Sequence, residues 1–256
     1  DTFHASLSFD YSQQGGTSTH TILNNFNPSA VSPLGVPLPP DLGDDRSSDL
    51  SLNFSSIDPV HDGEVKGANL TLDWELGATT LKSITAYREL EQFDTNDFDS
   101  SGYVFYDHSF TTEQDQFSQE LQLLGDNLDD RLHWVLGAFY YDEDAFHNNR
   151  IAMGGNNGVP PWIPDVPYAT RGVQRAIYNN QAFDIAIDSK ALFAHLVWDF
   201  AEDFSAVLGL RYTDEEKSAT WERERTRSAG PLSDILANLL YPEVPPTDLD
   251  RSEDNV

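Results

Sequence analysis

Cysteine is absent from the 256 residues, so the chain has neither disulfides nor thiolate chemistry. Positive charge is also scarce: the chain has 15 Lys and Arg but 43 Asp and Glu, so its formal net charge is −28. Binding to nucleic acid through a basic surface needs clustered Lys and Arg, so this function is excluded. Long apolar runs are missing too, and the mean hydropathy is −0.47. This excludes transmembrane helices but not transmembrane β-strands, whose alternating residues average out to polar.

What the sequence does contain is strict alternation of apolar and polar residues, most clearly over residues 191–217. This pattern predicts two strands, each with one apolar side, joined by a tight turn at 201–203. Each apolar row spans about nine residues, close to the ~9–11 that a tilted strand needs to cross a bilayer. The charged run at 214–217 is expected to lie beyond the second strand. The two apolar rows are Leu192, Ala194, Leu196, Trp198 and Phe200, then Phe204, Ala206, Leu208, Leu210 and Tyr212.

The rest of the chain repeats the same unit of strand, short turn, strand and long polar loop. Further strands are predicted at about 3–11, 64–76, 79–93, 113–124 and 132–144, with a lead-in to another strand at 250–256. Short turns are expected at 77–78 and from 125, and long loops at 13–62, 94–111, 146–182 and from 218, the last with a short helix near 232–240. Alternating short turns and long loops are typical of outer-membrane barrels.

The side of each strand that is apolar follows from the pattern in most cases. In 64–76 the apolar side carries Leu70, Leu72 and Trp74. In 132–144 the pattern favours the side of Trp134. The strand 79–93 stays open between the side of Leu81 and the side of Ile84. Trp74, Trp134 and Trp198 all lie near short turns, as an aromatic girdle at a membrane interface requires.

Three segments carry a resemblance to a known family: LDWELGATTLKSITAYREL at 72–90, DQFSQELQLLGDNLDDRLHWVLGAFYYDEDA at 115–145, and GLRYTDEEK at 209–217 after a WDF–AEDFS hairpin. The chain resembles the barrel of TonB-dependent outer-membrane receptors, especially the group found in sphingomonads and caulobacters. The resemblance implies an all-β, antiparallel, up-and-down transmembrane β-barrel with long extracellular loops. Such barrels have roughly 22 strands and a plugged lumen, so residues 1–256 would be a fragment with about seven strands. Plug, TonB box and closing C-terminal strand are not recognisable in it.

The function that the resemblance implies is energised uptake of a scarce nutrient across the bacterial outer membrane. The ligand would be an iron–siderophore complex, cobalamin or a carbohydrate, and the TonB complex would act through an N-terminal region outside this chain. The other partner would be outer-membrane lipid. No cofactor and no enzymatic activity are expected. Two alternatives are a passive porin-type barrel and a soluble secreted β-sandwich that binds carbohydrate.

Predictions for single residues follow from the apolar pattern. The expected lipid-facing residues are Leu70, Leu72, Trp74, Leu192, Leu196, Trp198, Leu208, Leu210 and Tyr212, and the expected lumen-facing residues are His195, Asp199 and Arg211. Arg211 is expected to pair with carboxylates on neighbouring strands. The acidic cluster at 142–144 with His147 is interpreted as a solvated strand end. The sequence has no G-x-S-x-G, no phosphate loop, no dinucleotide fingerprint and no zinc-type spacing among its seven His.

Overall fold

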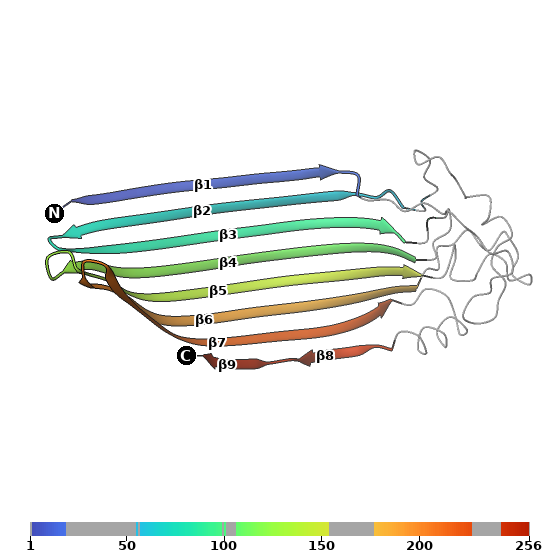
Figure 1. Ribbon diagram of the computed structural model, residues 1–256. Helices are drawn as coiled ribbons and strands as arrows, with labels where there is room; N and C mark the ends of the chain where they lie inside the picture. The colour runs from blue at the N-terminus through green and yellow to red at the C-terminus, as the bar shows by residue number, and fades with distance from the viewer. Residues whose placement is uncertain are drawn as a thin grey trace, which may run out of the picture.

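The computed structural model describes residues 2–18, 55, 57–98, 100, 106–153, 177–226 and 242–255, which form one antiparallel sheet (Figure 1). The all-β meander predicted from the sequence is thereby confirmed. Consecutive strands are neighbours throughout, in the order β1 to β8, and β9 also pairs with β7. The strands are β1 Phe3–Gly16, β2 His61–Leu76, β3 Thr79–Asp97, β4 Tyr106–Asn127, β5 Leu132–Met153, β6 Ile177–Ala201, β7 Phe204–Thr226, β8 Val244–Asp248 and β9 Arg251–Asn255.

The long strands extend well past their apolar parts. The charged run at 214–217 lies inside β7, whereas the sequence pattern placed it beyond the strand. It pairs residue by residue with β6, for example Glu216 with Asp188. Strand β5 likewise continues to Met153 through the predicted loop. The backbone ladder does not need apolar side chains, so polar residues extend these strands beyond the part that alternation can identify.

All the described short turns lie at one end of the sheet (Figure 1). The predicted turn at 77–78 is confirmed, and Gly77 takes a positive φ of 69° there, which suits glycine. The turn expected from residue 125 is displaced, because β4 continues to Asn127. The turn itself spans residues 128–131, and Leu128, Asp129 and Asp130 all have positive φ in it.

Strands β8 and β9 are two parts of one eighth strand. Both pair with β7 in a single register, from Thr220 opposite Asp248 to Thr213 opposite Asn255. Between them the Leu249 amide donates to the Ala219 carbonyl at 2.7 Å. The tail therefore already forms part of a strand, whereas its sequence predicted only the lead-in to a strand beyond this chain. A register irregularity next to Trp221 precedes the paired region. The short helix predicted near 232–240 lies outside the described residues.

The register separates the side chains into two faces, since directly opposed residues point to the same side. One row joins Phe3, Trp74, Leu81, Leu123, Leu136, Ala194 and Leu210. We call the side with this row the band face and the other side the polar face. Leu81 belongs to the band face, which decides the open question for β3. Trp134 also belongs to it, opposite Leu196, as its pattern favoured.

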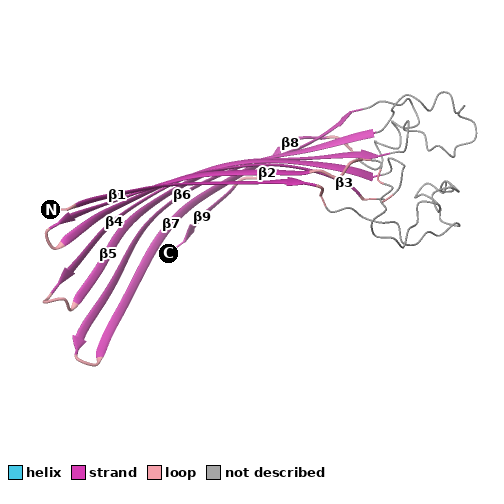
Figure 2. Cartoon of the chain, turned by 90° about the horizontal axis from the view of Figure 1, so that it is seen from above, coloured by secondary structure: helices cyan, strands magenta, loops and turns pink. Residues whose placement is uncertain are grey.

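The sheet is a twisted single layer without an interior of its own (Figure 2). Among the described residues the buried apolar side chains are only Ile151, Ala182 and Ala191. Many large apolar side chains are instead exposed, and within the described strands all of the exposed ones except Val207 lie on the band face. No helix in the described part of the chain has the length and apolarity to cross a membrane.

Candidate functional site

The three residues predicted to face a lumen all lie on the polar face. His195 is opposite Gly209, Asp199 is opposite Ser205 and Arg211 is opposite Phe193. They do not converge on a common point, because they occupy separate rows along the β6–β7 pair. Asp199 lies beside His133, whose Nε2 is 4.0 Å from Asp199 Oδ2. These residues therefore line a surface rather than form a compact site.

Arg211 makes different contacts from those predicted. Its guanidinium lies 5.6 Å from the Phe139 ring centroid and 5.9 Å from that of Phe193, and its Nε donates to Thr213 Oγ1 at 3.1 Å. No carboxylate among the described residues lies within ion-pair distance of it, so the predicted salt bridges are wrong. The reason is the register, which places Phe193 opposite Arg211. Gly137 on β5 leaves room for the Phe193 ring, since an added Cβ there would meet Phe193 Cζ at 2.1 Å. The two rings thus lie beside Arg211 and hold it by cation–π contact.

A set of aromatic rings at the long-loop ends of β4 to β7 was not predicted. We call it the aromatic row: His108, Phe110, His147, Phe183 and Trp221. Successive ring centroids along it are 5.1, 6.1, 6.2 and 6.2 Å apart. His147, Phe183 and Trp221 are direct cross-strand partners on the polar face. Sequence reasoning missed the aromatic row because it assigned His108, Phe110, His147 and Trp221 to long loops.

Polar side chains with unmet hydrogen-bonding capacity surround the aromatic row. Arg223 lies over Trp221, 5.1 Å from its ring centroid, and is in register with Gln181 and Asn149. Asn179 is only 1% exposed. Among the described residues no partner exists for Asn149 Oδ1, Asn179 Oδ1 and Nδ2, Trp221 Nε1 or Arg223 Nε, all of which are buried atoms. A buried polar atom without a partner costs ~1–3 kcal/mol, so these atoms are suited to bind an added polar group.

His108 stands at the outer end of the aromatic row, far from the apolar band. Its ring packs edge-on against Phe98 at 4.6 Å and against Phe110 at 5.1 Å. Burial lowers the pKa of His108, because the apolar surroundings disfavour the charged imidazolium. The aromatic row is therefore best formed with His108 neutral.

Acidic side chains are distributed very unevenly around this end of the sheet. On the polar face of β4 to β7, the four rows from Gln114 to His108 contain no Asp or Glu among their described side chains. The same segment of the band face carries Glu113, Asp184, Glu222 and Glu224, together with Arg150, and the next row adds Asp115 and Asp144. On the adjoining strand β3, the carboxylate of Asp94 lies opposite Phe110 on the polar face and is hydrogen-bonded to His61 Nδ1 at 2.6 Å.

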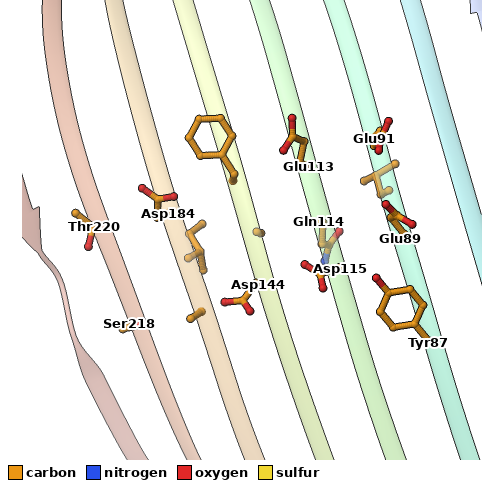
Figure 3. A pocket seen from close by; sticks show the side chains of 15 residues that line it. Tyr87, Glu89, Glu91, Glu113, Gln114, Asp115, Asp144, Asp184, Ser218 and Thr220 are labelled. Atoms are coloured by element: carbon orange, nitrogen blue, oxygen red, sulfur yellow. The ribbon is translucent and has the colours of Figure 1, made fainter.

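Several of these carboxylates line a shallow hollow on the band face (Figure 3). Its volume is about 450 Å³, and Tyr87, Glu89 and Glu91 form its β3 side. Within the described ranges, no three His, Asp or Glu side chains converge as metal ligands would. The predicted acidic cluster is divided likewise, since Asp142 and Asp144 lie on the band face and Glu143 and His147 on the polar face.

Comparison with known proteins agrees with this geometry. Residues 2–232 match the family described as TonB dependent receptor-like, beta-barrel. The fold is similar to the ferric yersiniabactin uptake receptor FyuA from Yersinia pestis, with a TM-score of 0.56 and 14% identity over 78% of this chain. The chain spans 25% of the length of that receptor. No curated protein matched the sequence. The chain therefore belongs to the β-barrel family of TonB-dependent receptors, which are outer-membrane proteins and not enzymes.

Proposed function

We propose that this chain is one wall of a receptor barrel, with the band face against lipid and the polar face toward the lumen. The proposal assigns Leu70, Leu72, Trp74, Leu192, Leu196, Trp198, Leu208, Leu210 and Tyr212 to lipid, and His195, Asp199 and Arg211 to the lumen. It rests on the concentration of exposed apolar side chains on one face. In water such a surface would be an aggregation site, whereas in lipid it is the ordinary surface of a barrel.

The slope of the apolar band supports this placement. The apolar band is the run of apolar side chains on the band face, and it ends at Tyr11 in β1 and at Tyr212 in β7. Followed from strand to strand, the row of paired residues that starts at Tyr11 reaches β7 at Ser218, which is six residues past Tyr212. At the short-turn end the band starts at Phe3 in β1 and at Phe204 in β7. The row that contains Phe3 reaches β7 at Leu210, which is six residues past Phe204. Six residues are about 20 Å along a strand, and the six strand spacings from β1 to β7 are about 29 Å. The band therefore crosses the strands at roughly 35° from the register rows, which matches the strand tilt of outer-membrane barrels.

The function that we propose for the whole receptor is TonB-energised uptake of a scarce nutrient, such as an iron–siderophore complex. The fold likeness to a ferric siderophore receptor supports this choice over cobalamin and carbohydrate, as does the aromatic row at the long-loop end. TonB would act through an N-terminal region outside this chain. The receptor group of sphingomonads and caulobacters is the one we propose as its nearest relatives. The β-sandwich alternative is set aside by the family match.

Uptake experiments in cells test this function and separate it from a passive porin. The full receptor gene is deleted or restored in its own host, with and without TonB, and the cells receive radiolabelled iron–siderophore complexes, cobalamin or maltodextrin. We expect one iron complex to accumulate only when both receptor and TonB are present. Uptake that needs the receptor but continues without TonB would show a passive barrel instead.

A further inference from the structure

We propose that the aromatic row and the polar groups around it bind an anionic ligand with aromatic rings, the class formed by ferric complexes of catecholate or phenolate chelators. This inference rests on the proposed function and narrows its ligand. It concerns the polar face of β4 to β7, at the long-loop end of the sheet.

The spacing of the rings is the first argument. From His108 to Trp221 no centroid is more than 6.2 Å from the next, so the aromatic row presents continuous π-surface across four strands. Phe183 and Trp221 are nearly parallel, with 14° between their planes. Planar aromatic groups stack favourably on such rings, with ~1–3 kcal/mol for each base stacked on an aromatic side chain in nucleic-acid complexes.

Charge is the second argument. On β4 to β7 the polar face around the aromatic row has no carboxylate among the described residues and contains the guanidinium of Arg223. The neighbouring strand β3 places Asp94 opposite Phe110, where it is hydrogen-bonded to His61 Nδ1 at 2.6 Å. Over the same rows of these strands, the band face carries four carboxylates and Arg150. A cationic ligand would gain nothing from this separation, whereas an anionic ligand avoids repulsion and meets a positive charge at close range.

Hydrogen-bonding capacity is the third argument. Asn179 Nδ2, Trp221 Nε1 and Arg223 Nε are buried donors that have no acceptor among the described residues. Phenolate and carboxylate oxygens are strong acceptors for such donors, particularly for the charged guanidinium. A ring-bearing anion thus matches all three properties of this surface, while a neutral sugar matches only the rings and the amides.

Binding to the purified full receptor in detergent tests the inference, with ferric enterobactin (a tricatecholate), ferrioxamine (a ring-free trihydroxamate) and maltoheptaose as probes. We expect ferric enterobactin to bind most tightly. Trp221→Leu and Arg223→Gln should each raise its Kd by about tenfold, the equivalent of one lost stacking or charged contact. Glu222→Gln is the matched control, since Glu222 adjoins both residues but lies on the band face, and its Kd should stay within about twofold.

Two results would overturn the inference. One is TonB-dependent uptake of ferrioxamine or maltodextrin without any binding of ferric enterobactin, which would leave energised uptake intact. The other is tight binding of ferric enterobactin that neither Trp221→Leu nor Arg223→Gln weakens, which would place the ligand elsewhere. Uptake that continues without TonB would instead refute the proposed function. Circular dichroism and heat-modified gel mobility verify that each variant is folded.

Discussion

Replacing Leu208 with arginine tests which face of the wall meets lipid. Leu208 is 54% exposed on the band face of β7, midway between the band's ends at Phe204 and Tyr212. An arginine at the bilayer midplane of a barrel costs ~2–4 kcal/mol. Leu208→Arg should therefore lower the folding equilibrium constant by roughly 30- to 1,000-fold. The measurement is a urea titration of the full receptor with phospholipid vesicles, followed by heat-modified gel mobility.

Val207 provides the matched control, since it is the adjacent residue and is 64% exposed on the polar face. Val207→Arg introduces the same charge one residue away and should change the folding free energy by no more than about 0.5 kcal/mol, as is usual at a wet surface. Val207→Ser should be tolerated equally well. If Val207→Arg costs as much as Leu208→Arg, the assignment of the faces is refuted.

Three further predictions concern other parts of the sheet. Gly137→Ala places a Cβ 2.1 Å from Phe193 Cζ, so the same titration should show a loss of ~1–3 kcal/mol, most of which Phe193→Leu restores. Burial lowers the pKa of His108 in the folded protein below its value of 6.5 in the unfolded chain. The unfolded chain therefore binds a proton more readily, and the free energy of unfolding should fall as the pH drops below 6.5. Hydrogen exchange at the long-loop ends should report this loss in the wild type and not in His108→Gln. In receptor variants that keep only one tryptophan, brominated lipid should quench the fluorescence of Trp198 on the band face but not that of Trp221 on the polar face. Equal quenching of the two would contradict the face assignment.

Period-two alternation was sufficient to predict the meander, because it reports directly which side of a strand is apolar. It could not give the strand ends. Asp188 and Glu216 are cross-strand partners in the middle of the β6–β7 ladder, yet in the sequence they resemble loop residues. The aromatic row was hidden for the same reason, since His147 lies in the segment 146–182, which composition assigns to a loop.

Properties that depend on register were also beyond the sequence. The partner of Arg211 was expected to be a carboxylate, but the register places Phe193 opposite it, and Gly137 leaves room for the ring. For β3, both sides mix apolar and polar residues, so only pairing with Trp74 shows that Leu81 is on the band face. Local pattern predicts elements, whereas contacts between strands require the alignment of whole ladders.

The lack of an interior affects how the receptor is made. With Ile151, Ala182 and Ala191 as the buried apolar side chains among the described residues, this wall gains little hydrophobic free energy by forming its sheet in water. That free energy becomes available only when the band face leaves the aqueous phase. Formation of the sheet and entry into the bilayer are then coupled, and before entry the alternating apolar residues of the chain remain exposed to water.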